Sequence, residues 1–207
     1  MVLRPHEPDP IYNGKPMSFW INSLYSGPAI LFKDYDPNLT PVLLKAMQTR
    51  DAPLQKAYHI VWPRLPAWAK RFLPTPRYAA QVRVNAILIV RMYAGHSTPA
   101  LPTLIHLMQE DKDPLVRATS ASTLGVCFSN DIFTKYQLPT VIPALLKSLK
   151  DKDPQVRREA TNAFIVIDRE AAAKAGIDVQ NPGPLRIRVS DARSQIRQGV
   201  NTNAPNK

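Results

Sequence analysis

Cysteine is almost absent from this chain, and glycine is scarce. Cys127 is the only cysteine among 207 residues, so an internal disulfide and a multi-cysteine metal site are excluded. The chain has 7 glycines against 21 prolines. This mix favours helices separated by proline over a glycine-rich β fold. The sequence contains no P-loop, GxGxxG or GxSxG motif.

Long apolar runs are also lacking. The longest runs, such as Ala86 to Val90, are far below the roughly 18 residues of a membrane span, so we predict no transmembrane segment in this chain. Residues 1–16 are polar and proline-rich and have no signal-peptide core. We therefore expect a cytoplasmic protein, or one of the cell envelope or periplasm if an upstream anchor or signal has been removed.

Acidic residues are missing from one long stretch. The formal net charge is +11, and no Asp or Glu lies between Asp51 and Glu110. A positive field of this kind attracts acidic proteins, nucleic acid or anionic lipid, although it also describes an ordinary solvated surface. The basic residues of this stretch are Lys56, Arg64, Lys70, Arg71, Arg77, Arg83 and Arg91.

What the chain does contain is a heptapeptide that occurs twice with one difference, as DKDPLVR at 111–117 and DKDPQVR at 151–157. In each copy, an aspartate that can cap a helix precedes a proline suited to the first helical position. Apolar or small residues then follow at i, i+4, i+7, i+8 and i+11, which is one face of a helix. A third copy of this frame, without the cap, begins at Val82.

A proline-bearing, leucine-rich helix precedes each capped copy, LPTLIHLMQE in one case and VIPALLKSLK in the other. Paired helices recurring at about 35–40 residues are the signature of an α-solenoid. By the same plan, residues 40–61 are predicted to form another pair. LPAWAKRFL is predicted to be the first helix of the pair that ends with residues 77–94.

The segments DKDPLVRATSASTLG and DKDPQVRREATNAF, each after such a helix, resemble HEAT repeats. The resemblance covers roughly residues 40–168 and is strongest over 99–168. The opening NGKPMSFWINSL also resembles the first helix of bacterial HEAT-repeat proteins. The resemblance implies an all-α, right-handed solenoid of about four antiparallel helix pairs in a monomer.

The same resemblance implies structural roles for the repeated residues. In HEAT repeats, turn aspartates and second-helix arginines form a ladder between neighbouring repeats. Arg83 matches the ladder arginine, but PTPRYAAQ stands where its repeat should have the turn aspartate. The ladder and cap residues implied here are Asp111, Asp113, Pro114, Arg117, Asp151, Asp153, Pro154, Arg157 and Arg83.

The sequence predicts three regions. Residues 1–15 are expected to form an extended arm, residues 16–175 the HEAT-repeat domain, and residues 176–207 a basic, flexible tail. The tail could instead fold back over the last helix pair.

No catalytic constellation is evident. The four histidines lack metal-ligand spacing, and Cys127 holds a core position of its helix. We therefore expect no cofactor, no metal and no enzyme activity. Two HEAT-like enzyme classes remain as alternatives, bilin lyases and alkylpurine DNA glycosylases. The glycosylase alternative rests on Trp62 and Trp68 among basic residues, but packing of both at a proline-bent junction is the favoured interpretation.

The most probable function from sequence is that of a non-catalytic scaffold or adaptor. We expect it to bind an acidic protein partner on the concave face, where second helices line up; nucleic acid is the alternative partner. The predicted partner-binding residues are Trp68, Lys70, Arg71 and Arg77.

Overall fold

The structure is a computed structural model, and it describes residues 11–12, 14–16, 19–20, 39–51, 53–73, 78–92, 98–129 and 135–180. All structural statements below concern these residues. Their α-helices are α2 (Leu39–Met47), α3 (Pro53–Val61), α4 (Ala67–Phe72), α5 (Ala79–Met92), α6 (Leu101–Glu110), α7 (Pro114–Ser129), α8 (Leu138–Ser148), α9 (Pro154–Ile167) and α10 (Arg169–Lys174). Short 3-10 helices are η1 (Trp62–Arg64), η3 (Thr98–Ala100) and η4 (Lys135–Gln137).

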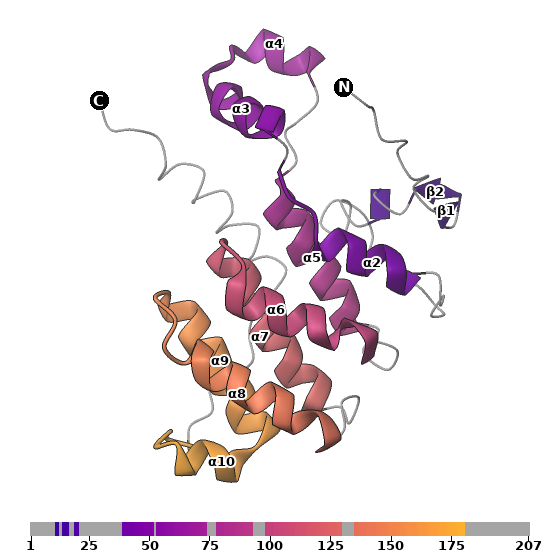
Figure 1. Cartoon of the computed structure of the whole chain (residues 1–207). Coiled ribbons are helices and arrows are strands. Elements are labelled where there is room, and N and C mark those ends of the chain that lie inside the picture. The colour runs from indigo at the N-terminus through magenta and orange to yellow at the C-terminus, as the bar shows by residue number, and fades with distance from the viewer. Residues whose placement is uncertain are drawn as a thin grey trace.

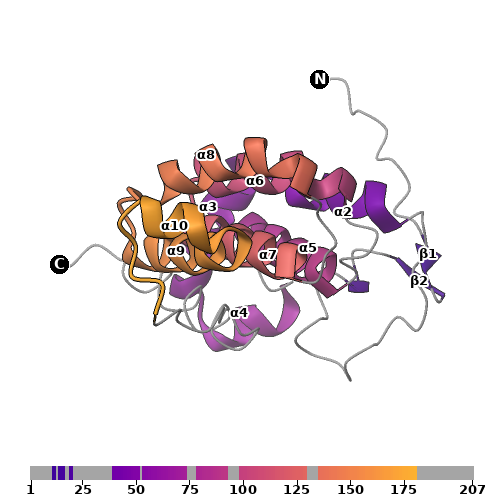
Figure 2. The ribbon, with the colours of Figure 1, turned by 90° about the horizontal axis from the view of Figure 1, so that it is seen from below.

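Three antiparallel helix pairs stack to form the body of the protein. The first repeat pairs α2 with α5, the second α6 with α7, and the third α8 with α9. The first helices of the pairs form one layer and the second helices form another (Figure 2). The second helices also pack along the stack, α5 on α7 and α7 on α9. The predicted all-α solenoid is thereby confirmed, and three of its pairs lie within the described residues.

The partners of the first repeat differ from the sequence prediction. Residues 40–61 were expected to form a pair with each other, and α4 was expected to pair with α5. Instead α2 packs against α5, and α3, η1 and α4 lie between them in sequence but outside the stack (Figure 1). The apolar face of α2 explains this choice, because Leu39, Leu43 and Met47 are buried in the same core as α5.

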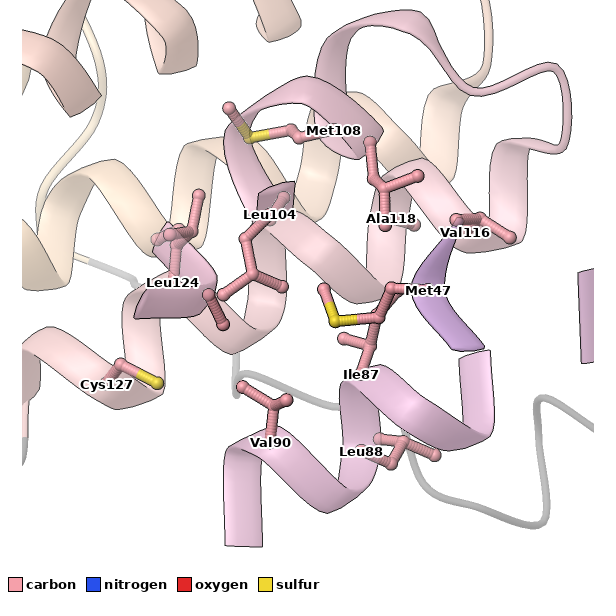
Figure 3. Packing of buried hydrophobic residues seen from close by; sticks show 14 of the residues in the cluster. Met47, Ile87, Leu88, Val90, Leu104, Met108, Val116, Ala118, Leu124 and Cys127 are labelled. Atoms are coloured by element: carbon pink, nitrogen blue, oxygen red, sulfur yellow. The ribbon is translucent and has the colours of Figure 1, made fainter. Parts of the chain in front are cut away.

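Helix α7 forms the centre of the core. Its residues are buried without interruption from Leu115 to Gly125, and Cys127 is buried as well. Figure 3 shows side chains of α2, α5, α6 and α7 converging on one another, among them Met47, Ile87, Leu104 and Leu124.

Small residues let neighbouring helices approach α7 closely on several sides. Two of them are hydroxyl residues that are satisfied within the helix. Thr119 Oγ1 donates to the Leu115 carbonyl at 2.7 Å, and Ser120 Oγ donates to the Val116 carbonyl at 2.9 Å.

The chain ends are described only in part. Within the predicted extended arm, β1 (Ile11–Tyr12) and β2 (Lys15–Pro16) pair as a short antiparallel hairpin, and Gly14 turns it with a φ of 73°. Gly176, with a φ of 81°, follows α10 as a left-handed helix end. Most of NGKPMSFWINSL (residues 13–24), the segment that resembles a first helix, lies outside the described residues, and so does the tail beyond residue 180.

Candidate partner-binding site

The turns of the second and third repeats have the same geometry. Asp111 Oδ1 accepts the Asp113 backbone N–H at 2.9 Å, and Asp151 Oδ1 accepts the Asp153 N–H at the same distance. The second aspartate of each turn then caps the following helix: Asp113 Oδ1 accepts from Leu115 N at 2.8 Å, and Asp153 Oδ1 from Gln155 N at 2.8 Å. Each turn is thus closed by two carboxylates with a single exposed lysine between them, Lys112 or Lys152.

Arginines join these turns from one repeat to the next. Arg117 donates to both oxygens of Asp151, at 2.8 and 2.9 Å, and its side chain is almost fully buried. It also donates to the Asp111 carbonyl at 2.8 Å, so one guanidinium ties its own turn to the next. Burial alone would raise the pKa of Asp151, but the bonds from Arg117 and from the Asp153 N–H hold it below its ordinary value.

Arg157 occupies the same position in the third repeat. It donates to the Asp151 carbonyl at 2.8 Å and to the Lys152 carbonyl at 3.0 Å. No carboxylate accepts from it among the described residues, and it is exposed. Arg157 therefore supplies the bonds within a turn without the bond to a following repeat.

The first repeat has the same turn, split in two. The Ala79 N–H donates to Asp51 Oδ1 at 2.9 Å, as the Asp113 N–H does to Asp111. Arg83 Nη1 donates to the Thr49 carbonyl at 2.7 Å, and Arg83 also binds Asp111, with Nε 2.8 Å from Oδ2. Asp51 and Ala79 thus take the two aspartate positions, and residues 52–78 stand where the other turns have one lysine.

This assignment supplies the turn aspartate that PTPRYAAQ lacks. The sequence prediction overlooked Asp51 because it lies far from Arg83 along the chain. A signal was nevertheless present: Asp51 closely follows the apolar stripe of its helix, as Asp111 and Asp151 follow theirs.

Residues 52–78 are called the insertion below. Their described elements, α3, η1 and α4, project from the stack as a helical hairpin (Figure 1). Several contacts lie within the hairpin. Arg64 and Lys70 donate to backbone carbonyls of Ile60 and Pro63, at 3.4 and 3.2 Å. The rings of Tyr58 and Trp62 lie 5.5 Å apart. At its base, His59 stacks on Tyr78 with ring centroids 4.1 Å apart.

Large apolar side chains of the insertion face solvent. The exposed fractions are 70% for Trp68, 84% for Phe72 and 83% for Leu54, and Ile60 and Val61 are exposed as well. Packing was the favoured interpretation for both tryptophans. It is wrong for Trp68, because most of this side chain faces solvent; Trp62 is half-buried beside Tyr58.

The predicted partner-binding residues are partly brought together. Trp68, Lys70 and Arg71 lie on α4 within one turn of each other, and Arg71 is exposed while Lys70 is half-buried. Arg77 lies outside the described residues. Phe72 and Leu54 were not predicted, although acid-free apolar stretches next to prolines are a signal that could have indicated them.

Candidate groups for catalysis are buried or engaged elsewhere. Burial raises the pKa of the Cys127 thiol to about 12, so it stays protonated. Glu110, the helix neighbour of His106, accepts a bond from Lys147 Nζ at 2.6 Å. Burial also raises the pKa of the Glu159 carboxyl, but that side chain has no exposed surface to offer a substrate.

The described residues hold neither a metal-binding cluster nor a membrane-spanning helix. They contain no group of three or more His, Cys, Asp or Glu side chains arranged to hold a metal ion. In the same part of the chain, every helix is too short or too polar to cross a bilayer.

Comparison with known families agrees with this geometry. The HEAT repeat family matches residues 76–165, which run from the end of the insertion through α5 to most of α9. Residues 76–165 are thus HEAT repeats. No curated protein and no solved structure matches the chain. The HEAT match begins where the insertion ends, as expected if the insertion separates α2 from the rest of its repeat.

Proposed function

We propose that this HEAT-repeat protein is a non-catalytic scaffold that binds an acidic macromolecular partner through its insertion. The observation that supports this most directly is the solvent exposure of Trp68 and Phe72 on an element that contains no acidic residue. Solenoids commonly present binding surfaces built from stacked repeats, and an element that departs from the repeat is a natural place for specificity.

Charge distribution favours the insertion over the rest of the stack. Several basic side chains of the repeats face carboxylates, as Arg117 faces Asp151 and Lys174 faces Glu170. In the insertion, Arg64 and Lys70 donate to backbone carbonyls instead, and no carboxylate of the described residues forms an ion pair with either of them. A partner with an acidic surface therefore gains most by binding there.

This proposal moves the contact away from the middle of the concave face. The sequence prediction placed the partner along the second helices. However, α7 is buried from Leu115 to Gly125 and so exposes no side chains there to a partner. The exposed aromatic and basic groups lie on α4 instead.

Charge reversal tests the proposal. Lys70, Arg71 and Arg77 are changed to glutamate together, and acidic proteins retained by the immobilised chain are quantified from a cell lysate. The control reverses Arg169 and Lys174, two exposed basic residues of α10, which lies away from the insertion (Figure 1). We expect the first variant to lose the acidic proteins that wild type and control retain. Equal retention by all three would remove the insertion from the proposed function.

Nucleic acid is a second candidate, favoured by the exposure of Trp68. Aromatic rings among cations can stack on bases while the cations hold phosphates. Fluorescence anisotropy of labelled single-stranded and duplex oligonucleotides at several salt concentrations tests it. Tight binding with a steep salt slope would support this candidate, and weak binding at physiological salt would reject it.

A further inference from the structure

We propose that the acidic partner of the insertion is the surface of an anionic lipid bilayer. This inference rests on the proposed function, because it takes the insertion as the contact element and names what that element touches. Three features of the described residues carry it: the apolar side chains, the charges, and the position of the insertion on the stack.

The apolar side chains project outward. On α4, Trp68 and Phe72 are spaced i, i+4 and therefore share one side of the helix. On α3, Leu54 and Val61 are spaced i, i+7 and share one side as well. All four are exposed. A bilayer accepts projecting apolar groups of any shape, whereas a folded partner must offer a pocket for each of them.

The residue types also suit the boundary between lipid and water. Tryptophan is enriched there because its ring is apolar and its N–H can still reach water or headgroups. Phenylalanine and leucine can enter the acyl boundary beside it. Long basic side chains extend toward the headgroups while their methylene stems lie along apolar surface, and Lys70 and Arg71 directly precede Phe72.

The charges of the insertion are all of the sign that an anionic surface attracts. Its sequence holds Lys56, Arg64, Lys70, Arg71 and Arg77 and no Asp or Glu. No carboxylate of the insertion would therefore be repelled by anionic headgroups. Basic residues close to such a surface each add to the attraction, which is screened by salt.

The stack places further cations on the same edge. The arginine ladder joins neighbouring turns side by side, because Arg83 binds Asp111 and Arg117 binds Asp151. Lys112 and Lys152 occupy in their turns the place that the insertion occupies in the first, and both are exposed. A surface contacted by the insertion would therefore also face these lysines, with the turn aspartates already bound to arginines and N–H groups.

The test uses the full chain and sedimentation with two kinds of vesicle, phosphatidylcholine alone and phosphatidylcholine with phosphatidylserine. We expect binding to the anionic vesicles that weakens with salt, and at least tenfold weaker binding to the neutral ones. A blue shift of tryptophan emission on binding should disappear in Trp68→Phe, because Trp20 is buried and Trp62 half-buried.

Two double variants separate the contributions. Trp68→Ala with Phe72→Ala removes the apolar contact, and Lys70→Glu with Arg71→Glu reverses the charge; each should weaken binding to anionic vesicles about tenfold or more. The matched controls are Tyr136→Ala and Lys174→Glu. Tyr136 is 92% exposed but precedes α8, at the end of that helix opposite the turn, and Lys174 lies on α10. Neither control should change binding.

The outcomes distinguish this inference from the proposed function. The bilayer inference is overturned if wild type fails to bind anionic vesicles, or if both double variants bind them as tightly as wild type does. If the charge-reversed variant of the insertion nevertheless fails to retain the acidic proteins that wild type retains from a lysate, the proposed function stands with a protein partner. If the protein binds oligonucleotides in a salt-sensitive manner but does not bind vesicles, the bilayer inference is overturned and nucleic acid is the favoured partner. If charge reversal affects none of these assays, both proposals fall.

Discussion

The turn of the first repeat and the turns of the second and third form the same hydrogen bond with very different lengths of chain. A single lysine separates the two turn positions in the later repeats, whereas residues 52–78 separate Asp51 from Ala79 in the first. The hydrogen bond across the turn is 2.9 Å in all three. The comparison shows that side-chain bonds and the packing of α2 on α5 define this repeat. A short connection between the two turn positions is not required. The cost of closing a longer loop grows only slowly with its length.

The largest predicted effect concerns the ladder that both kinds of turn share. Arg117→Ala should lower the free energy of unfolding by about 3–5 kcal/mol, because it leaves Asp151 without its cation and opens a buried site between two repeats. Urea unfolding followed by circular dichroism measures the change.

Arg157→Ala is the matched control for that experiment. Arg157 makes the same bonds within its turn but is exposed and binds no carboxylate among the described residues, so its loss should cost about 1 kcal/mol or less. Similar losses for the two variants would show that the bonds within a turn matter and that the rung between repeats does not.

A second pair of variants contrasts the stack with the insertion directly. Leu104 of α6 is fully buried, and Leu104→Ala should cost about 2–5 kcal/mol through lost burial and a residual cavity. Leu54 of α3 is 83% exposed, and Leu54→Ala should change stability by no more than about 0.5 kcal/mol. Thermal unfolding of both proteins gives the comparison. A large loss for Leu54→Ala would mean that the insertion is packed against the rest of the chain.

The sequence was most informative where the repeat is contiguous. DKDPLVR and DKDPQVR predicted helices beginning at Pro114 and Pro154, and α7 and α9 begin there. Aspartate–proline caps and a helical apolar stripe are local signals, so they can be recognised without knowledge of the tertiary structure. The preceding leucine-rich helices were predicted for the same reason, and they are α6 and α8.

Non-local pairing was what the sequence could not supply. Adjacent helices were assumed to pair, so α3 was assigned to α2 and α4 to α5. The packing of α2 on α5 reveals the true pair, and so do the bonds of Ala79 with Asp51 and of Arg83 with Thr49 across the insertion. The exposure of Trp68 escaped prediction for a related reason, because a tryptophan in a proline-bent segment is usually buried by neighbours that this segment does not have.

A smaller effect on stability is expected from pH. It acts on the ion pair of Arg117 with Asp151, which joins the second and third repeats. The pKa of Asp151 lies below its ordinary value in the folded protein, so its ionised form contributes stability above its unfolded pKa of about 3.9. That contribution is lost as the pH falls through the folded pKa. Asp151→Asn should therefore lower the melting temperature clearly at pH 7, and the gap to wild type should narrow near pH 3. A gap of the same size at both pH values would contradict an ionic role for Asp151.

The smallest predicted effect on stability comes from the largest change to the chain. Replacing residues 52–78 with one lysine gives the first repeat the turn length of the others. The free energy of unfolding should change by less than about 1 kcal/mol, because α2 can still pack on α5 and the shorter turn already exists at Asp111–Asp113. Circular dichroism and thermal unfolding measure this directly.

Excision also separates the two regions by function. A folded, stable excised protein that no longer binds anionic vesicles would place binding in the insertion and stability in the stack. Loss of cooperative unfolding would instead mean that α3 and α4 support α5, for example through the stacking of His59 on Tyr78, the residue before α5. The same variant thus tests what holds the two helices of a HEAT repeat together. If the aspartate and arginine bonds do so, and the loop does not, a HEAT turn can accept a functional insertion.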